Sequence, residues 1–201
     1  NNIDIADGKD DTGSSAELSL IAAAAKTVSI TGAGDLELNS DSDLKAVTLI
    51  DASKMTGDLV VISQNKTAAS TIKGGSGDDV LTASTSNSAL VIDQVNTLIG
   101  GAGNDILTAN NGKSILTGGA GNDTFVINTA SYTVDYASTI TDLGSGDIIK
   151  FANATSFVKL TDTPDLDGNP NLSAFANAAI NEVGLNTMVW FQYNNNTYIV
   201  M

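Results

Sequence analysis

Large apolar residues recur at a nearly constant interval through the middle of the chain. Successive members lie nine residues apart, except for one step of eight. The series comprises Ile72, Leu81, Leu90, Leu98, Leu107, Leu116, Phe125 and Val134. This period matches neither a helix nor an ordinary amphipathic strand, whereas it suits a short strand followed by a turn. We therefore expect two such units to form one coil of a parallel β-solenoid, with the large apolar residues stacked inside.

Three nonapeptides within this series are nearly identical. They read GGSGDDVLT at residues 74–82, GGAGNDILT at 100–108 and GGAGNDTFV at 118–126. The last two begin two nine-residue periods apart, and the ANNGKSILT between them keeps the strand but lacks the Gly-Gly start. Because glycine tolerates positive φ, each of these turns can present several carbonyl oxygens on its inner side.

The sixth position of each nonapeptide is an aspartate, which adds a carboxylate to those carbonyl oxygens. Ca²⁺ takes about six to eight oxygen ligands, so two stacked turns are needed to hold one ion. The pattern G-G-x-G-x-D-x-U-x, where U is a large apolar residue, resembles the RTX family, which implies a calcium-binding β-roll. We expect more than one calcium ion, and we expect the repeats to be largely unfolded without it.

Turns on one edge of the roll are expected two periods apart, so the second and third nonapeptides should stack around an ion. Asp105 and Asp123 are its predicted side-chain ligands. Its predicted carbonyl ligands are those of Gly100, Ala102, Gly118 and Ala120, or those one residue later, Gly101, Gly103, Gly119 and Gly121. Asn104 and Asn122 are expected to point to solvent.

The first nonapeptide is expected on the opposite edge, where its downstream neighbour at residues 92–96 contains no glycine. Its upstream neighbour is the Thr-Gly-Asp at 56–58, which suggests a second ion between two aspartates. The predicted ligands of this ion are Asp58, Asp79, Gly74 and Ser76.

Residues 138–151 read STITDLGSGDIIKF and resemble the segment that closes the β-roll in RTX exoproteins. Leu143 and Lys150 depart from the usual form of that segment. The resemblance suggests a further calcium site at Asp142 and Asp147; alternatively, both acids cap turns.

The segments on either side of the repeats predict further elements. Apolar β-rich runs at 28–31, 36–38, 46–50 and 59–62 suggest irregular coils of the same solenoid. Residues 18–26 suit either a short capping helix or one more strand. In the tail, helical spacing of apolar residues predicts a helix that begins near Asn171 or Ser173 and ends at Gly184. Residues 188–193 and 197–201 predict a β-hairpin around three asparagines.

The expected fold is therefore all-β, a parallel β-solenoid or β-roll with calcium-binding turns, closed by a small helix and a β-hairpin. Residues 1–64 are assigned to irregular solenoid coils and residues 65–151 to the calcium-binding β-roll. Residues 152–201 are assigned to the helix-and-hairpin cap.

Composition narrows the function. Nine Lys+Arg against 23 Asp+Glu give a net charge of -14, which disfavours nucleic acid and anionic lipid as partners. The chain has neither cysteine nor histidine, so it lacks disulfides, the usual general base and the commonest zinc ligand. No apolar stretch approaches the roughly 18 residues of a transmembrane segment, and the polar start suggests no signal peptide. We expect no catalytic residues and no enzymatic activity.

Two classes of function are compatible with these features. The Thr-, Ser- and Ala-rich solenoid, the few RTX repeats and the aromatic end resemble the C-terminal part of bacterial S-layer proteins. That resemblance implies type I secretion, a place on the cell surface, and copies of the same protein as lattice partners. It also implies contact with cell-surface polysaccharide through other parts of the parent protein. The alternative is the C-terminal calcium domain of a secreted RTX hydrolase, such as a serralysin-type protease or lipase, or of an RTX adhesin.

Overall fold

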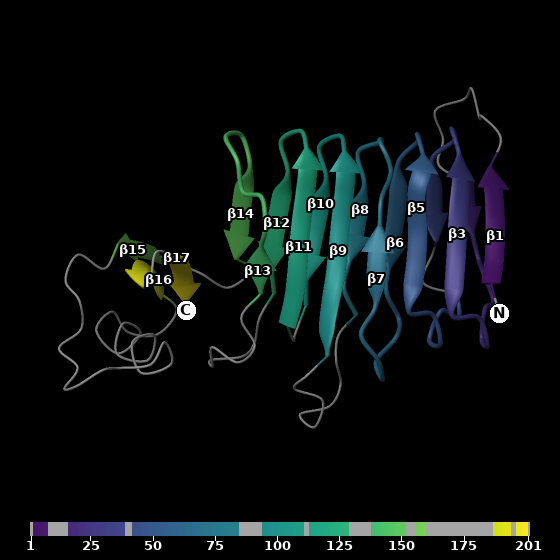
Figure 1. Cartoon of the computed structure of the whole chain (residues 1–201), viewed down its shortest axis with the longest axis horizontal. Coiled ribbons are helices and arrows are strands. Elements are labelled where there is room, and N and C mark those ends of the chain that lie inside the picture. The colour runs from purple at the N-terminus through teal and green to yellow at the C-terminus, as the bar shows by residue number, and fades with distance from the viewer. Residues whose placement is uncertain are drawn as a thin grey trace.

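The computed structural model describes residues 2–7, 16–38, 42–84, 94–110, 113–128, 138–151, 156–159, 187–193 and 196–200. Two seven-stranded parallel sheets form the two faces of a solenoid, and the chain alternates between them (Figure 1). In order, sheet A consists of β1 (Asn2–Asp7), β3 (Thr27–Gly32), β5 (Leu49–Met55), β7 (Thr71–Lys73), β9 (Val95–Ala102), β11 (Lys113–Ala120) and β13 (Thr139–Ile140). Sheet B consists of β2 (Ala16–Leu18), β4 (Leu36–Leu38), β6 (Leu59–Ile62), β8 (Val80–Thr82), β10 (Ile106–Ala109), β12 (Thr124–Ile127) and β14 (Ile148–Phe151).

The apolar series lies in the core between the two sheets, as predicted. In sheet A, Ile72 pairs with Leu98 and Leu98 with Leu116; in sheet B, Leu81 pairs with Leu107 and Leu107 with Phe125. All six side chains are 0% exposed. Burial of one such side chain contributes about 1.5–3 kcal/mol, so this ladder is the main apolar contribution of the repeats to stability. Leu90 and Val134 lie outside the described residues.

The length of a coil varies more than the nine-residue period predicts. From Asp105 to its counterpart Asp123 in the next coil, the residue number rises by 18, whereas from Asp79 to Asp105 it rises by 26. The extra residues belong to the connections from sheet B back to sheet A, such as residues 83–94 compared with 110–112. Since each strand keeps its apolar pairing, these connections absorb the difference.

The strands predicted before the repeats are largely confirmed. Runs 36–38 and 59–62 coincide with β4 and β6, run 28–31 lies within β3, and run 46–50 overlaps only the start of β5. Between 18 and 26, neither the predicted helix nor one continuous strand forms. β2 ends at Leu18, Ile21 makes an isolated parallel bridge to Asp43, and the amide of Ala25 donates to the carbonyl of Ala22 in a turn.

A third sheet follows the solenoid in sequence, with the order β15 (Ser156–Lys159), β16 (Thr187–Tyr193) and β17 (Asn196–Val200). β16 and β17 pair antiparallel, as the predicted hairpin requires. The helix predicted between 171 and 184 lies outside the described residues, and the role of the tail as a cap stays a prediction, as do the domain boundaries. Within the described residues, no helix is long and apolar enough to cross a membrane.

Candidate metal centre

The described loops that combine glycine with aspartate all lie on one edge of the solenoid, along the upper margin of Figure 1. Each of them connects a strand of sheet A to the next strand of sheet B. They are residues 33–35, 56–58, 74–79, 103–105, 121–123 and 141–147. On the opposite edge, the described residues of the connections contain no glycine. Any metal ligands that these loops provide therefore lie along one edge of the solenoid.

The second and third nonapeptides stack directly on each other, as expected from their spacing. Gly101 and Ala102 pair with Gly119 and Ala120, and the amide of Gly103 donates to the carbonyl of Ala120 over 2.9 Å. A Cβ on Gly119 would overlap the carbonyl oxygen of Gly101. Only glycine allows the two turns to approach this closely, and Gly101 and Gly119 also have positive φ, 129° and 109°.

The first nonapeptide lies on this same edge, so its predicted place on the opposite edge is wrong. The amide of Ala102 donates to the carbonyl of Gly75 over 3.0 Å, and the amide of Asp79 donates to Asp105 Oδ1 over 2.8 Å. The longer intervening coil returns loop 74–79 to the edge of the other two turns. Two interfaces between complete Gly-Gly-x-Gly-x-Asp turns result, one more than the sequence predicted. The near-identity of the three motifs is the feature of the sequence that could have predicted the second interface.

Four aspartates form a ladder on the inner side of this edge, which we call the aspartate ladder: Asp79, Asp105, Asp123 and Asp147. In each step, a backbone amide donates to Oδ1 of the aspartate in the next coil. The donors are Leu59, Asp79, Asp105 and Asp123, at 2.7, 2.8, 2.9 and 2.8 Å. In the two preceding coils, Leu59 and Leu36 occupy the corresponding inward position.

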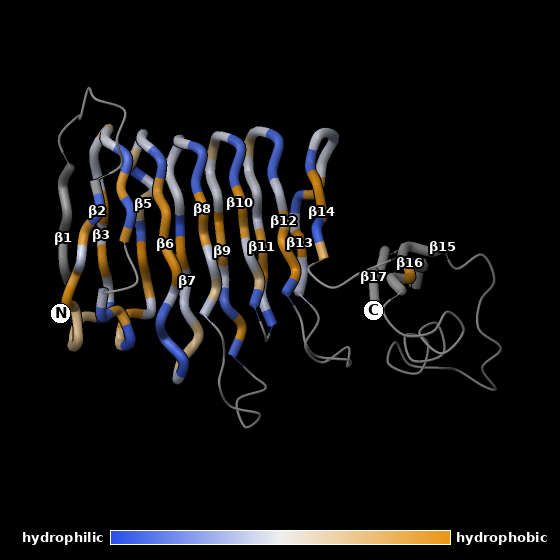
Figure 2. The backbone as a smooth tube through the Cα atoms, turned by 180° about the vertical axis from the view of Figure 1, so that it is seen from behind, coloured by the Kyte–Doolittle hydropathy of each residue, from blue (hydrophilic) through white to orange (hydrophobic). Residues whose placement is uncertain are grey.

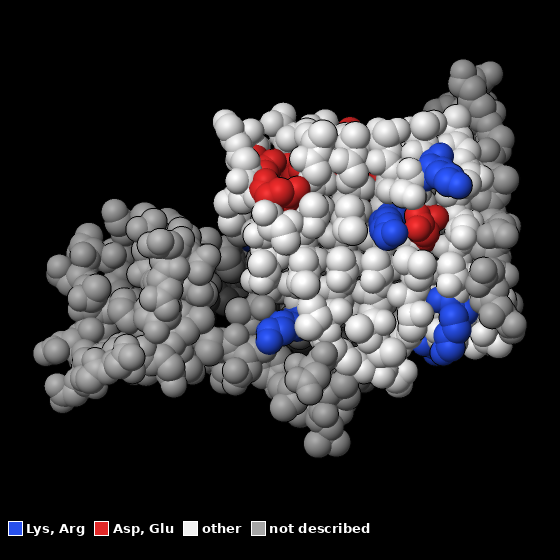
Figure 3. All heavy atoms as spheres, viewed as in Figure 1, with Lys and Arg blue, Asp and Glu red and all other residues white. Residues whose placement is uncertain are grey.

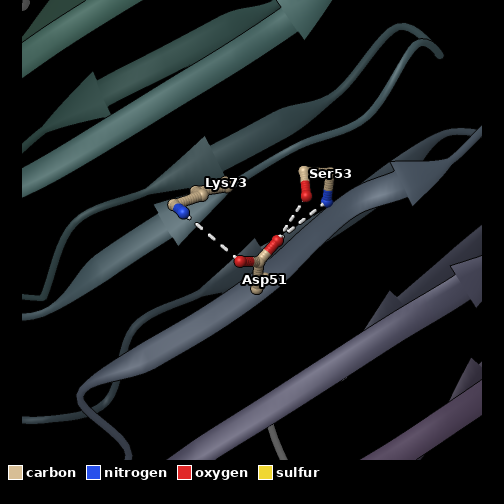
Figure 4. A network of polar contacts seen from close by, with 3 residues as sticks. All are labelled: Asp51, Ser53 and Lys73. Atoms are coloured by element: carbon tan, nitrogen blue, oxygen red, sulfur yellow. Dashed lines mark hydrogen bonds and ion pairs between the residues drawn. The ribbon is translucent and has the colours of Figure 1, made fainter.

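Three of the four carboxylates of the ladder are buried, and none of the three has a cationic side chain as a partner among the described residues. Asp79, Asp105 and Asp123 are 0%, 1% and 2% exposed. The ion pairs found among the described residues involve other acids: Lys45 with Asp43, and Lys73 with Asp51, which also accepts hydrogen bonds from Ser53 (Figure 4). A buried carboxylate is costly unless it is paired or coordinates a metal, so this edge has an unmet need for positive charge.

The pKa values reflect this need. Burial, reinforced by the neighbouring carboxylates, raises the pKa of Asp105 to about 7 and that of Asp79 to about 6. Burial also raises the pKa of Asp123; the hydrogen bond from the amide of Asp105 opposes this rise, and the charges of Asp147 and Asp142 add to it. By contrast, hydrogen bonds from the amides of Asp123 and Gly144 lower the pKa of Asp147. The centre of the ladder is therefore where the negative charge is least stabilised.

Oxygen atoms of successive coils converge at the first glycine of each turn. Asp105 Oδ2 is buried and accepts no hydrogen bond. A Cβ on Gly100 would overlap this oxygen and lie 2.6 Å from the carbonyl oxygen of Gly118. At Gly74, a Cβ would likewise overlap Asp79 Oδ2 and lie 2.5 Å from the carbonyl oxygen of Gly100. A carboxylate oxygen beside a carbonyl oxygen, one of them unsatisfied, is the donor chemistry that Ca²⁺ prefers.

The ligand set in this arrangement consists mostly of carbonyl groups. No cluster of three or more acidic side chains within the described part of the chain is arranged to hold a metal. Within the first predicted carbonyl set, Gly118 places its oxygen beside Asp105 Oδ2, whereas the carbonyl of Ala120 accepts from the amide of Gly103. That residues 100–105 and 118–123 supply the ligands stays a prediction. The geometry described above is compatible with it.

The second ion, with Asp58, Asp79, Gly74 and Ser76 as its predicted ligands, stays a prediction, although Asp58 and Asp79 do not lie opposite each other in register. Because Val60 pairs with Val80, the residue opposite Asp58 is Asp78, whose amide donates to Asp58 Oδ1 over 2.6 Å. Asp58 belongs to a second, outer ladder, in which each side chain accepts from an amide of the next coil. Its accepting members are Asp35, Asp58, Asp78 and Asn104, and the last amide is that of Asn122, over 3.0 Å. Asn104 and Asn122 are exposed, as expected.

The last coil ends the stack of glycine turns. Asp142 takes the place of the first glycine, and its two carboxylate oxygens accept from the amides of Gly118 and Gly119 at 3.0 and 2.8 Å. Asp147 Oδ2 accepts from the amide of Gly144 within its own turn at 2.7 Å. Both acids thus satisfy backbone amides of turns, one of the two roles proposed for them; a calcium site there stays a prediction.

Comparison with known families agrees with this geometry. A family model described as the RTX calcium-binding nonapeptide repeat (4 copies) matches residues 67–87 and 93–125. The two matched segments contain all three glycine turns and are separated within the longer coil that joins Asp79 to Asp105. No curated protein matches the chain as a relative. The chain therefore contains RTX calcium-binding repeats, which are typical of secreted, extracellular proteins.

Neutralising Asp105 or Asp123 should weaken calcium-driven folding more than neutralising Asp78. Asp105→Asn and Asp123→Asn remove a buried carboxylate at the convergence of oxygens, whereas Asp78→Asn removes the same charge from the exposed outer ladder. Loss of a residue that only supports a metal ligand costs about 10–100-fold in metal affinity, so loss of a ligand should cost at least as much. Calcium titrations followed by circular dichroism measure the three midpoints. Equal shifts would show that the inner position is not the ligand position.

Stability of the calcium-free chain should fall as pH rises from 5 to 8. The pKa values of Asp79 and Asp105 in the folded state, about 6 and about 7, exceed the ordinary value of 3.8. The folded state therefore binds more protons, and this contribution, complete below the ordinary pKa, is lost as pH passes through 6 and 7. Circular dichroism in chelator measures the folded fraction across this range, with Asp105→Asn as the variant that should flatten the dependence on pH. A stability that increases toward pH 8 would contradict the assignment.

Proposed function

We propose that this chain, which contains RTX calcium-binding repeats, is part of a bacterial surface-layer protein that folds and self-assembles outside the cell. In this proposal the chain has a structural role and no catalytic one. The observation that supports it most is the aspartate ladder, three of whose carboxylates are buried without a cation. At neutral pH, the uncompensated charge of this edge opposes folding of the repeats until calcium binds.

Calcium links folding to location. Cytosolic calcium is low, whereas extracellular calcium modules bind at about 10⁻⁴–10⁻³ M. The repeats would remain unfolded in the producing cell, which suits export as an extended chain by type I secretion. Outside, the metal would neutralise the ladder and stack turns 74–79, 100–105 and 118–123.

Self-assembly follows from charge and shape. A net charge of -14 opposes the close approach of two copies, and bound calcium reduces that repulsion. Both sheets offer flat outward faces, and open strands at the end of a solenoid favour further pairing. Copies of the same protein are thus the natural partners, with cell-surface polysaccharide engaged by other parts of the parent protein.

The alternative is the calcium-binding tail of a secreted RTX hydrolase or adhesin. It shares the loops, the metal and the extracellular location. The chain contains no histidine, so an H-E-x-x-H zinc site would have to lie elsewhere in such a protein. The two proposals differ in what calcium does after folding, because a tail of an enzyme remains monomeric.

The intact parent protein should assemble into sheets as calcium rises through the millimolar range. Light scattering and electron microscopy across that series measure assembly, and circular dichroism measures folding of the same samples. A parent protein with Asp105→Asn and Asp123→Asn should need more calcium for both, whereas Asp78→Asn should behave nearly as the wild type. A parent protein that folds with calcium but stays monomeric would favour the hydrolase alternative.

A further inference from the structure

The outward face of sheet B is uncharged and largely apolar over four neighbouring strands. Two rows of side chains cross it in the register of the sheet. The first row is Glu37, Val60, Val80, Ile106, Thr124 and Ile148. The second is Ile62, Thr82, Thr108, Val126 and Lys150. We define the sheet B patch as the residues of β6, β8, β10 and β12 in these two rows, together with Ile148.

The isoleucines of this patch are the most exposed of its members. Ile62, Ile106 and Ile148 are 53%, 38% and 51% exposed. Figure 2 shows these strands from the side of sheet B, with the hydropathy of both their inward and their outward residues in colour. The inward residues of these strands already fill the core, so the outward isoleucines contribute nothing to it. An exposed, uncharged and largely apolar patch of this kind marks an interaction surface.

Sheet A differs in character. Its outward positions include Asp51, Lys54, Lys73 and Lys113, and Figure 3 shows lysines and acids spread over that face. The solenoid therefore has one polar, charged face and one apolar face, although both are built from strands of the same coils.

Charges of opposite sign border the sheet B patch at its two ends. Glu37, on β4, precedes Val60 in the first row, and Glu17 precedes Glu37. Lys150, on β14, follows Val126 in the second row and is exposed. No charged side chain lies on β6, β8, β10 or β12 between them. This face is therefore negatively charged at one end of the solenoid axis and positively charged at the other.

We infer that the sheet B patch is the contact between two copies of this chain, packed face to face with their solenoid axes antiparallel. A two-fold axis parallel to the strands places β4 of one copy opposite β14 of the other. Glu37 then lies diagonally across from the partner's Lys150, twice in each pair, and Ile106 lies opposite the partner's Val80 in the centre. With the solenoid axes parallel, the acidic ends would meet each other and so would the basic ends. Charge complementarity thus selects the antiparallel arrangement.

The size of the patch sets the strength of the contact. Six strands from β4 to β14, about 4.8 Å apart, give a face about 24 Å long. A face of this length and four residues in width falls short of the ~800 Å² per partner that a stable dimer buries. We therefore expect weak pairing, suited to an array in which many copies contact one another. This inference rests on the proposed self-assembly and names the surface responsible for it.

Sedimentation velocity of this chain in calcium, from about 10 µM to about 1 mM, tests the pairing. Ile106→Lys should raise the dimer dissociation constant at least tenfold. Ile115→Lys is the matched control, because Ile115 on sheet A is also 38% exposed and should leave pairing unchanged. Circular dichroism in calcium confirms that each variant is folded. A wild-type chain that is monomeric throughout, or equal effects of the two variants, would overturn the inference.

Charge reversal tests the orientation without altering the apolar centre. Glu37→Lys and Lys150→Glu should each weaken pairing, and the double variant should restore it, because the two residues lie across the contact from each other. Lys113→Glu, on sheet A, makes the same change of charge and should have no effect. Failure of the double variant to restore pairing would exclude the antiparallel contact.

The same variants separate this inference from the proposed function. If the chain pairs through the sheet B patch but the parent protein never assembles in calcium, the surface-layer proposal fails and the contact stands. If the parent protein assembles equally well with Ile106→Lys, the contact proposed here is wrong and calcium-driven assembly stands.

Discussion

The structure depends on a line of carboxylates enclosed between stacked turns. Asp79, Asp105 and Asp123 are buried, and each Oδ1 accepts an amide of the preceding coil. Those hydrogen bonds hold the coils in register, yet they do not neutralise the charge, and an uncompensated buried charge costs several kcal/mol. The same residues that align the coils thus destabilise them until a cation binds. Calcium, which prefers carboxylate and carbonyl oxygens together, resolves that conflict.

This constraint divides one continuous solenoid into two parts. In the early coils, Leu36 and Leu59 occupy the inward position, so apolar side chains and not carboxylates fill that position. From Asp79 onward the position is acidic. The boundary lies where the amide of Leu59 donates to Asp79 Oδ1. The apolar coils therefore provide a surface on which the first calcium-binding turn can stack.

Much of this was predictable from local pattern, and the remainder depended on coil length. The inward ladder from Ile72 to Phe125 and the stacking of the last two nonapeptides follow from the nine-residue period and its double. The predicted edge of the first nonapeptide was wrong, because it assumed coils of uniform length. Apolar pairing such as Val60 with Val80 sets the register, and variable connections on the far edge absorb the difference. The amide-to-carboxylate ladders require three-dimensional placement that spacing alone does not give.

Hydrogen exchange with and without chelator tests the central claim most directly. The amides of Asp79 and Asp105 donate to carboxylates of the ladder, whereas the amide of Leu36 donates to the carbonyl of Asp58 in the apolar coils. Removal of calcium should accelerate exchange at Asp79 and Asp105 by orders of magnitude and change that at Leu36 far less. Equal, strong protection of Asp79 and Asp105 in the absence of calcium would contradict a metal-dependent stack.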